Sequence, residues 1–129
     1  MKNPSPKTLK AKLWKLCQKL TREKYGNVCY ICGARNLIGA NWHTCHLIPS
    51  GSCGAYLRYD LRNLRPCCYH DNINLGGNGA EFYRQMVKEV GQKVVDKLFK
   101  DKNVIVKADK TWYLSKIADG WLPICSERF

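Results

Sequence analysis

The cysteines are the residues whose spacing in this sequence most directly indicates chemistry. Cys29 and Cys32 are separated by two residues, and Gly33 follows them. Two cysteines in a tight turn of this kind can direct both sulfurs at one tetrahedral ion, and zinc is the metal that such sites usually hold. Redox-active motifs share the spacing, but no strand–helix pattern of the redox type surrounds this pair. We therefore predict that Cys29 and Cys32 bind a structural zinc ion.

A second pair of ligands is available further along the chain. Cys68 and Asp71 are three residues apart, and so are Cys67 and His70. At the start of a helix, the members of either pair would share one face. Sulfur and nitrogen suit zinc better than a carboxylate does, which favours Cys67 with His70, although a carboxylate is permitted. The ligand chemistry alone leaves both pairs open.

Histidine and asparagine side chains are interleaved with these ligands. His46 is followed by Leu-Ile-Pro and a glycine-containing loop, Asn63 begins the segment Asn-Leu-Arg-Pro, and Asn72 directly follows Asp71. A single asparagine usually caps a turn, and a single histidine is usually an ordinary hydrogen-bonded residue. The ordered set, placed among metal ligands, indicates an active site instead.

In these segments the sequence resembles the HNH, or ββα-metal, nucleases. Those proteins carry a CxxC, a histidine at the end of a first strand, and an Asn-Leu-x-Pro-x-Cys-x-x-Cys segment that leads into a helix. Further elements are similar to one branch, the phage NinG/Rap recombination proteins, and the resemblance covers roughly residues 9–100. The segments that carry it are CYIC (29–32), WHTCHLIP (42–49), LRY (57–59), NLRPCCYHDN (63–72), GN (77–78) and Tyr83.

The resemblance implies an α+β fold. A zinc-stabilised ββα-metal core, like that of endonuclease VII, would be flanked by an N-terminal helix and C-terminal helices. The resemblance also favours Cys68 and Asp71 as the second half of the structural zinc site, although Asp71 stands where the family has a cysteine. His70 and Cys67 remain the alternative ligands.

The resemblance further implies a metal-dependent DNA endonuclease of the HNH type. His46 would act as general base on a water, and Asn63 would hold the His46 ring or order its loop. Asn72 would offer an oxygen to a catalytic Mg²⁺ or Mn²⁺. Cys45 is the second candidate ligand of this cation, because other branches place Asp or Gly at its position, although a thiol is a poor ligand for Mg²⁺.

The same resemblance indicates the substrate class. The expected substrates are branched recombination intermediates such as four-way (Holliday) junctions. Because a four-way junction has two-fold symmetry, we expect a homodimer with two active sites.

The charge of the chain indicates a polyanionic partner. Twenty-two Lys and Arg against ten Asp and Glu give a net charge of +12, and residues 1–24 alone hold eight basic side chains and one acid. The alternative to DNA binding is that the arginines form salt bridges on the surface and that the lysines only keep the protein soluble. The residues that we expect to bind DNA are Arg58, Arg62, Arg65, Lys12, Lys15, Lys19 and Asn78.

A small number of elements must position these residues. Apolar residues at helical spacing predict a helix over 9–24, and NWHTCHLI (41–48) and LRNLRP (61–66) predict two strands. Two helical stripes follow Gly79 and Gly91, and the last segment, around 112–117, favours a helix. We expect one domain, 1–129, made of a basic N-terminal part (1–24), a zinc/HNH core (25–79) and a helical C-terminal part (80–129).

The patterns of apolar and basic residues indicate the compartment. No apolar run approaches the ~20 residues that a membrane span needs, and the lysine-rich N-terminus lacks the pattern of a secretory signal. We therefore expect a cytoplasmic protein of a bacterium or phage-infected host cell, with no membrane partner. Disulfides are rare in that compartment, so we expect the eight cysteines to be reduced.

Three alternatives follow from the same features. A zinc-stabilised nucleic-acid-binding module without catalysis explains the charge, the CxxC and the aromatic residues, but leaves His46, Asn63 and Asn72 without a role. A general HNH nickase or endonuclease keeps the chemistry and changes the substrate. A disulfide-rich secreted protein would account for the cysteines alone.

Overall fold

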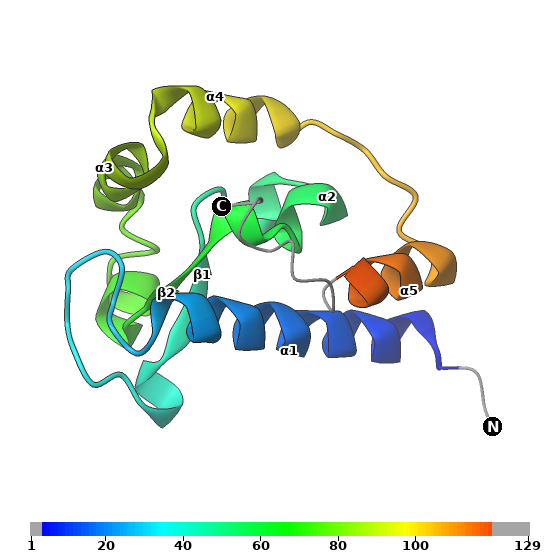
Figure 1. Ribbon diagram of the computed structural model, residues 1–129, viewed down its shortest axis with the longest axis horizontal. Helices are drawn as coiled ribbons and strands as arrows, with labels where there is room; N and C mark the ends of the chain where they lie inside the picture. Colours follow the sequence, from blue (N-terminus) through cyan, green and yellow to red (C-terminus); the bar gives the residue numbers. More distant parts are fainter. Residues whose placement is uncertain (1–3, 120–129) are drawn as a thin grey trace.

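The computed structural model describes residues 4–119, and a two-stranded antiparallel hairpin lies at its centre. Strand β1 (His43–His46) pairs with β2 (Leu64–Cys67), so that His43 lies opposite Cys67 and His46 lies opposite Leu64. The hairpin lies between α1 on one side and α4 on the other (Figure 1). This register places the first residue of β1 beside the residues that directly follow β2.

Helix α1 (Pro6–Tyr25) begins and ends at residues suited to those positions. The side chain of Ser5 accepts a hydrogen bond from the backbone N–H of Thr8, and Pro6 stands at the first position, where no N–H is needed. Gly26 follows the helix with a φ of 72°, which favours glycine. One face of the helix is buried along a stripe of residues four apart: Leu9, Leu13, Cys17 and Thr21.

The segment between the strands is organised by Asn63, which has no exposed surface. Its Oδ1 accepts from the Ile48 N–H at 2.8 Å, and its Nδ2 donates to the carbonyls of Ile48 at 3.1 Å and Leu57 at 3.3 Å. One side chain therefore joins both ends of the connection to its middle. The connection contains η2 (Ser50–Ser52), α2 (Ala55–Arg58) and η3 (Leu61–Asn63).

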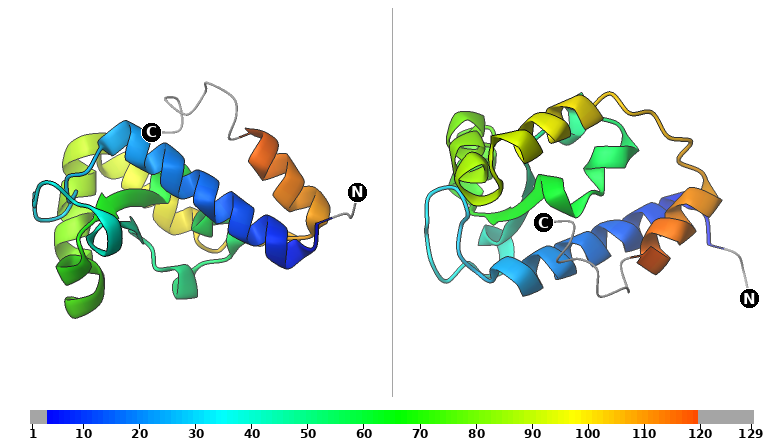
Figure 2. Two further views of the ribbon diagram at one scale, coloured as in Figure 1. Left: turned by 90° about the horizontal axis from the view of Figure 1, so that it is seen from below. Right: turned by 45° about the horizontal axis from the view of Figure 1, so that its top comes forward.

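After β2 the chain forms a five-residue π-helical turn, η4 (His70–Asn74), and then three helices. The helices are α3 (Gly79–Val90), α4 (Gln92–Asp101) and α5 (Lys110–Asp119), and a short turn, η1 (Gly39–Asn41), precedes β1. Helix α5 packs against α1, and α3 packs against α4. Both views of Figure 2 show α5 beside α1.

Two groups of buried apolar side chains hold these elements together. The first fills the space between the hairpin, α3 and α4, and it includes Cys45, Phe82, Met86, Val95 and Leu98. The second joins α1 to β2 and α5, and it includes Leu9, Leu13, Leu64, Tyr113 and Ile117. Burying such a side chain contributes about 2 kcal/mol, so each face of the hairpin is fixed by a core of its own.

The structure confirms a mixed α+β class that is rich in helices, with both strands and the four main helices where the sequence predicted them. One local prediction was wrong. The residues after β2 form a π-helical turn, whereas the sequence led us to expect the first turn of an α-helix. Among residues 4–119, no helix is long and apolar enough to cross a membrane.

Candidate functional site

Four side chains from two distant segments meet in one cluster that can hold a metal ion. Cys29 and Cys32 come from the turn after α1, and Cys68 and Asp71 come from the end of β2 and the start of η4. Their ligand atoms all lie within 4.8 Å of one another. Asp71 Oδ2 accepts from the thiols of Cys29 at 3.1 Å and Cys68 at 3.3 Å, and the Cys32 and Cys68 sulfurs are 3.8 Å apart.

The surroundings of this cluster fit a tetrahedral metal. Three sulfurs and one carboxylate oxygen make a four-ligand set of the kind that zinc accepts. Asn78, which has a left-handed backbone conformation, donates from Nδ2 to Asp71 Oδ1 at 3.1 Å. That bond orients the carboxylate and leaves Oδ2 directed at the three sulfurs. Partners of this kind fix the geometry of metal ligands in proteins.

The two alternative ligands are placed elsewhere. His70 is exposed, and its Nδ1 faces the Asn74 amide at 3.2 Å. Cys67 is bonded to Cys45 in a disulfide. The structure therefore brings together Cys29, Cys32, Cys68 and Asp71, and leaves out both His70 and Cys67.

The Cys45–Cys67 disulfide corrects two expectations from the sequence. Cys45 cannot bind a catalytic metal while its sulfur is bonded, and the cysteines are not all reduced. The strand register explains the pairing. Cys67 lies opposite His43, two residues from Cys45 along β1, so the two cysteines are diagonal neighbours with Cα atoms 6.0 Å apart. That separation is within the range for disulfides.

Asn72 meets a residue that the sequence analysis did not single out. Its Nδ2 donates to His43 Nδ1 at 2.7 Å, and His43 Nε2 lies 2.7 Å from the Ala40 carbonyl oxygen. A carbonyl oxygen only accepts, so Nε2 carries the proton and the lone pair of Nδ1 points at Asn72. The edge of Tyr69 lies against the His43 ring.

The strand register was the signal that could have identified His43. The first residue of β1 lies opposite the last residue of β2, and η4 begins directly beyond it. Pairing the two strands in the sequence analysis would have placed His43 beside Asn72.

A pocket of about 460 Å³ at the other end of β1 contains His46. Its ring stacks on Trp14 with centroids 5.2 Å apart, and Nε2 donates to the Arg58 carbonyl at 2.9 Å. Burial lowers the pKa of His46 below 6.5, and the nearby charge of Arg58 acts in the same direction. His46 is therefore neutral near pH 7, with its proton on Nε2 and its lone pair on Nδ1.

A second pocket, of about 440 Å³, lies at the His43 end of β1. The guanidinium of Arg22 lies over the Trp42 ring at 4.3 Å and donates to the Trp42 carbonyl. The Thr44 hydroxyl is buried there with no hydrogen-bond partner in the part of the chain that the structure describes. The residues that line this pocket are Trp14, Gln18, Arg22, Gly39, Ala40, Trp42, His43, Thr44 and Asn72.

Asn63 orders the loop after β1, which is one of the two roles expected for it. All three of its hydrogen bonds go to the backbone of Ile48 and Leu57. The Nε2 of His46, in contrast, is held by the backbone of Arg58. His46, Asn63 and Asn72 therefore do not meet as one side-chain cluster.

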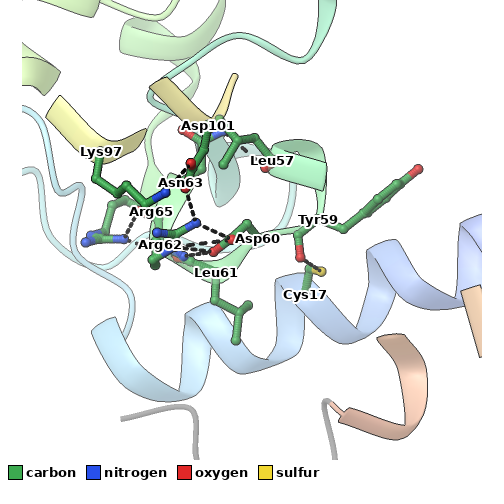
Figure 3. A network of polar contacts seen from close by, with 10 residues as sticks. All are labelled: Cys17, Leu57, Tyr59, Asp60, Leu61, Arg62, Asn63, Arg65, Lys97 and Asp101. Carbon is green, nitrogen blue, oxygen red and sulfur yellow. Dashed lines mark hydrogen bonds and ion pairs between the residues drawn. The ribbon is translucent and has the colours of Figure 1, made fainter. Parts of the chain in front are cut away.

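The three arginines that we expected to bind DNA have structural partners, and Figure 3 shows those of Arg62 together with the backbone contacts of Arg65. Arg62 pairs with Asp60 at 2.9 Å and with Asp101 at 3.1 Å, and Lys97 pairs with the same Asp101 at 2.8 Å. These contacts tie η3 to α4. Two carboxylates already occupy the Arg62 guanidinium, so a DNA phosphate would have to compete with them.

Arg65 is also held by the protein. Its side chain is 1% exposed and forms an ion pair with Glu89, so a phosphate cannot reach it. Arg58 donates to the carbonyls of Ser50 and Cys53, but it also lines the pocket beside His46. Of the three arginines, only Arg58 lies where an anion in a pocket could contact it.

The other residues expected to bind DNA differ in their surroundings. Lys12, Lys15 and Lys19 are exposed on α1, and Lys19 approaches Glu23 at 3.9 Å. The amide of Asn78 is used by Asp71, so its role in the structure is to orient the metal cluster.

The family of the chain follows from comparison with known proteins. Neither the curated proteins nor the solved structures gave a match. The sequence model of one family, described as Bacteriophage Lambda NinG protein, matches residues 5–114. That range includes the metal cluster, both pockets, helices α1 to α4 and the first half of α5. The chain therefore belongs to the bacteriophage lambda NinG family.

Proposed function

We propose that the protein is a metal-dependent DNA endonuclease of the HNH type, which cuts phosphodiester bonds in branched recombination intermediates such as four-way junctions. The observation that carries this proposal is the contact between His43 and Asn72. The turn that offers Asp71 to the structural metal offers the next residue, Asn72, to a second pocket. The strands β1 and β2 with η4 would then correspond to the ββα-metal element.

The His43–Asn72 pair fits a divalent cation. Histidines that bind metals usually donate their other ring N–H to a carbonyl or carboxylate, as His43 does to Ala40. A half-turn of the Asn72 amide replaces Nδ2 by Oδ1 beside His43 Nδ1, which gives one nitrogen and one oxygen ligand. The bound cation would neutralise charge on the scissile phosphate. Because imidazole suits transition metals and Mg²⁺ prefers oxygen, this pair favours Mn²⁺ over Mg²⁺.

His46 is the proposed general base. Its neutral ring, with the proton fixed on Nε2, leaves Nδ1 able to take a proton from a water. His46 lies three positions from His43 along β1, or about 10 Å between Cα atoms. Because side chains three positions apart leave a strand on opposite faces, the scissile phosphate would have to lie where the two pockets meet, beside Trp14.

A DNA-binding module without catalysis is the second candidate, and two observations favour it. The disulfide blocks Cys45, which stands where other HNH branches place a hard ligand or glycine. Trp14 covers one face of the His46 ring. In this second function the metal cluster would only stabilise the fold, and the basic side chains would bind DNA.

Cleavage assays on matched substrates test the proposal. The purified protein and its His46→Ala variant are incubated with a labelled four-way junction and with a linear duplex of the same sequence, in Mn²⁺, Mg²⁺ or EDTA. Paired cuts near the branch point that need metal and His46 support a junction endonuclease, and a homodimer that places one site on each strand. Equal cutting of both substrates would indicate a general HNH endonuclease. Tight binding without cutting would favour the binding module.

A further inference from the structure

Helix α1 carries a stripe of side chains beside its buried face. Positions 7, 11, 14, 18 and 22 are separated by four, three, four and four residues, so they follow one side of the helix. The stripe runs past both ends of β1, and Trp14 lies at its middle. Its members are Lys7, Ala11, Trp14, Gln18 and Arg22, with Lys10 beside them.

The two pockets of β1 share Trp14 as a common wall. The His46 pocket is lined by Lys7, Lys10 and Ala11 from α1 and by Tyr59, whereas the His43 pocket is lined by Gln18 and Arg22. Each has a volume within the range of about 300–1,000 Å³ that small-molecule sites occupy. The pockets are therefore adjacent compartments along one helix, and each can take a group of about the size of a nucleotide.

The charge of the two compartments fits a polyanion. Lys7, Lys10 and Arg58 line the first, and Arg22 lines the second; among the described residues, no acidic side chain lines either. Arg22 Nε is buried and has no hydrogen-bond partner in the described part of the chain. Basic groups beside aromatic walls are the combination that binds single-stranded nucleic acid, because bases stack on the rings while cations contact phosphates.

We propose that the α1 stripe and the two pockets form a track for a single unpaired DNA strand. The inference rests on the proposed function in taking DNA as the substrate, and it adds that the bound strand is unpaired at the cut. Bases within a duplex are stacked on both faces and cannot enter pockets lined by Trp14, Tyr59 or Trp42. The two pockets lie at the two ends of β1, about 10 Å apart, and share Trp14, so neighbouring nucleotides of one unpaired strand can occupy both.

The track is tested by binding measurements without metal, so that cleavage plays no part. Fluorescence anisotropy in EDTA compares a labelled single-stranded oligonucleotide with the duplex of the same sequence. We expect the single strand to bind at least about tenfold more tightly, with the stacking of a single base contributing about that factor. Equal or tighter binding of the duplex would overturn the inference.

A double variant locates the strand on the protein. Lys7→Ala with Lys10→Ala removes two exposed charges from the track, and Lys93→Ala with Lys100→Ala removes two from α4, outside both pockets. We expect only the first pair to weaken single-strand binding, and to reduce the slope of log K against log salt by about 1.4, the value for two phosphate contacts. Equal losses in the two double variants would show that the lysines act through net charge alone.

The two proposals can fail separately. If the protein cuts DNA in Mn²⁺ but binds the duplex more tightly in EDTA, the proposed function is supported and the single-strand track is contradicted. If the protein binds the single strand through Lys7 and Lys10 but cuts no DNA, the track is supported and the endonuclease function is contradicted.

Discussion

Asn72 donates to His43 across 2.7 Å, although 29 residues separate them in the sequence. Two features produce this contact. The antiparallel register brings the first residue of β1 beside the last residue of β2, and η4 then holds Asp71 and Asn72 in different directions. Asp71 faces three cysteine sulfurs while Asn72 faces His43. The candidate structural metal and the candidate catalytic pair are thus joined through one peptide bond.

The choice of cation should depend on His43. Because imidazole is a softer ligand than a carboxylate, we expect the native protein to cut DNA at least several-fold faster in Mn²⁺ than in Mg²⁺. His43→Asp supplies a hard oxygen and should reverse that preference. Rates measured in both metals for both proteins give the test. A ratio that His43→Asp leaves unchanged would mean that His43 does not bind the cation.

The cysteine cluster should hold one zinc ion that the fold requires. Cys29→Ser removes a buried ligand and should eliminate bound zinc and the cooperative unfolding transition, since binding of a structural metal is coupled to folding. Cys53→Ser is the matched control, because Cys53 is buried but lies outside the cluster. Elemental analysis and thermal unfolding provide the readouts. Native zinc content in a stable Cys29→Ser protein would contradict the assignment.

Asn63 should contribute mainly to stability. Asn63→Ala leaves the Ile48 N–H and the carbonyls of Ile48 and Leu57 without their partner, and a buried unsatisfied group costs about 1–3 kcal/mol. We expect the free energy of unfolding in urea to fall by about 3 kcal/mol. Asn74→Ala, at an exposed position, should change it little. If the two variants unfold at the same urea concentration, Asn63 does not hold the loop.

The pH dependence of cleavage should report the neutral state of His46. Burial lowers the pKa of His46 below 6.5, so the ring stays neutral, and able to accept a proton, under mildly acidic conditions. The rate should therefore be constant from pH 8 to 6.5 and should fall only below that range. Because the folded-state pKa is lowered, the contribution of His46 to stability is complete above about pH 6.5 and is lost as the pH falls. A rate that halves between pH 7 and 6.5 would contradict the assignment.

Local patterns were sufficient for the strands and main helices and for the Cys29 and Cys32 half of the metal cluster. Helical spacing predicted α1, α3, α4 and α5. The three-residue spacing of Cys68 with Asp71, and of Cys67 with His70, restricted the second pair of zinc ligands to two choices. Contacts between distant segments could not be obtained in this way. Neighbouring arginines such as Arg62 and Arg65 are typical of a phosphate-binding site. Their partners, Asp101 and Glu89, come from helices whose packing no local pattern encodes.

The same limit explains the three departures at the candidate site. The position of His43 beside Asn72 and the Cys45–Cys67 disulfide both follow from the pairing of β1 with β2. A shift of the strand register by one residue would have changed both contacts. The π-helical turn at η4 contains Asp71, which contacts Asn78 and the cysteines of the distant turn after α1, and local sequence patterns do not encode such contacts.

The most direct test of the central claim is cleavage of a labelled four-way junction in Mn²⁺ by the native protein and by Asn72→Ala, with Asn74→Ala as the control. Zinc content and thermal unfolding are measured on all three, so that a loss of folding is recognised. We expect metal-dependent cutting by the native protein and by Asn74→Ala. We expect a loss of at least about 100-fold in Asn72→Ala, comparable to losing a transition-state contact worth about 2.7 kcal/mol. Undiminished cutting by a folded, zinc-loaded Asn72→Ala protein would contradict it.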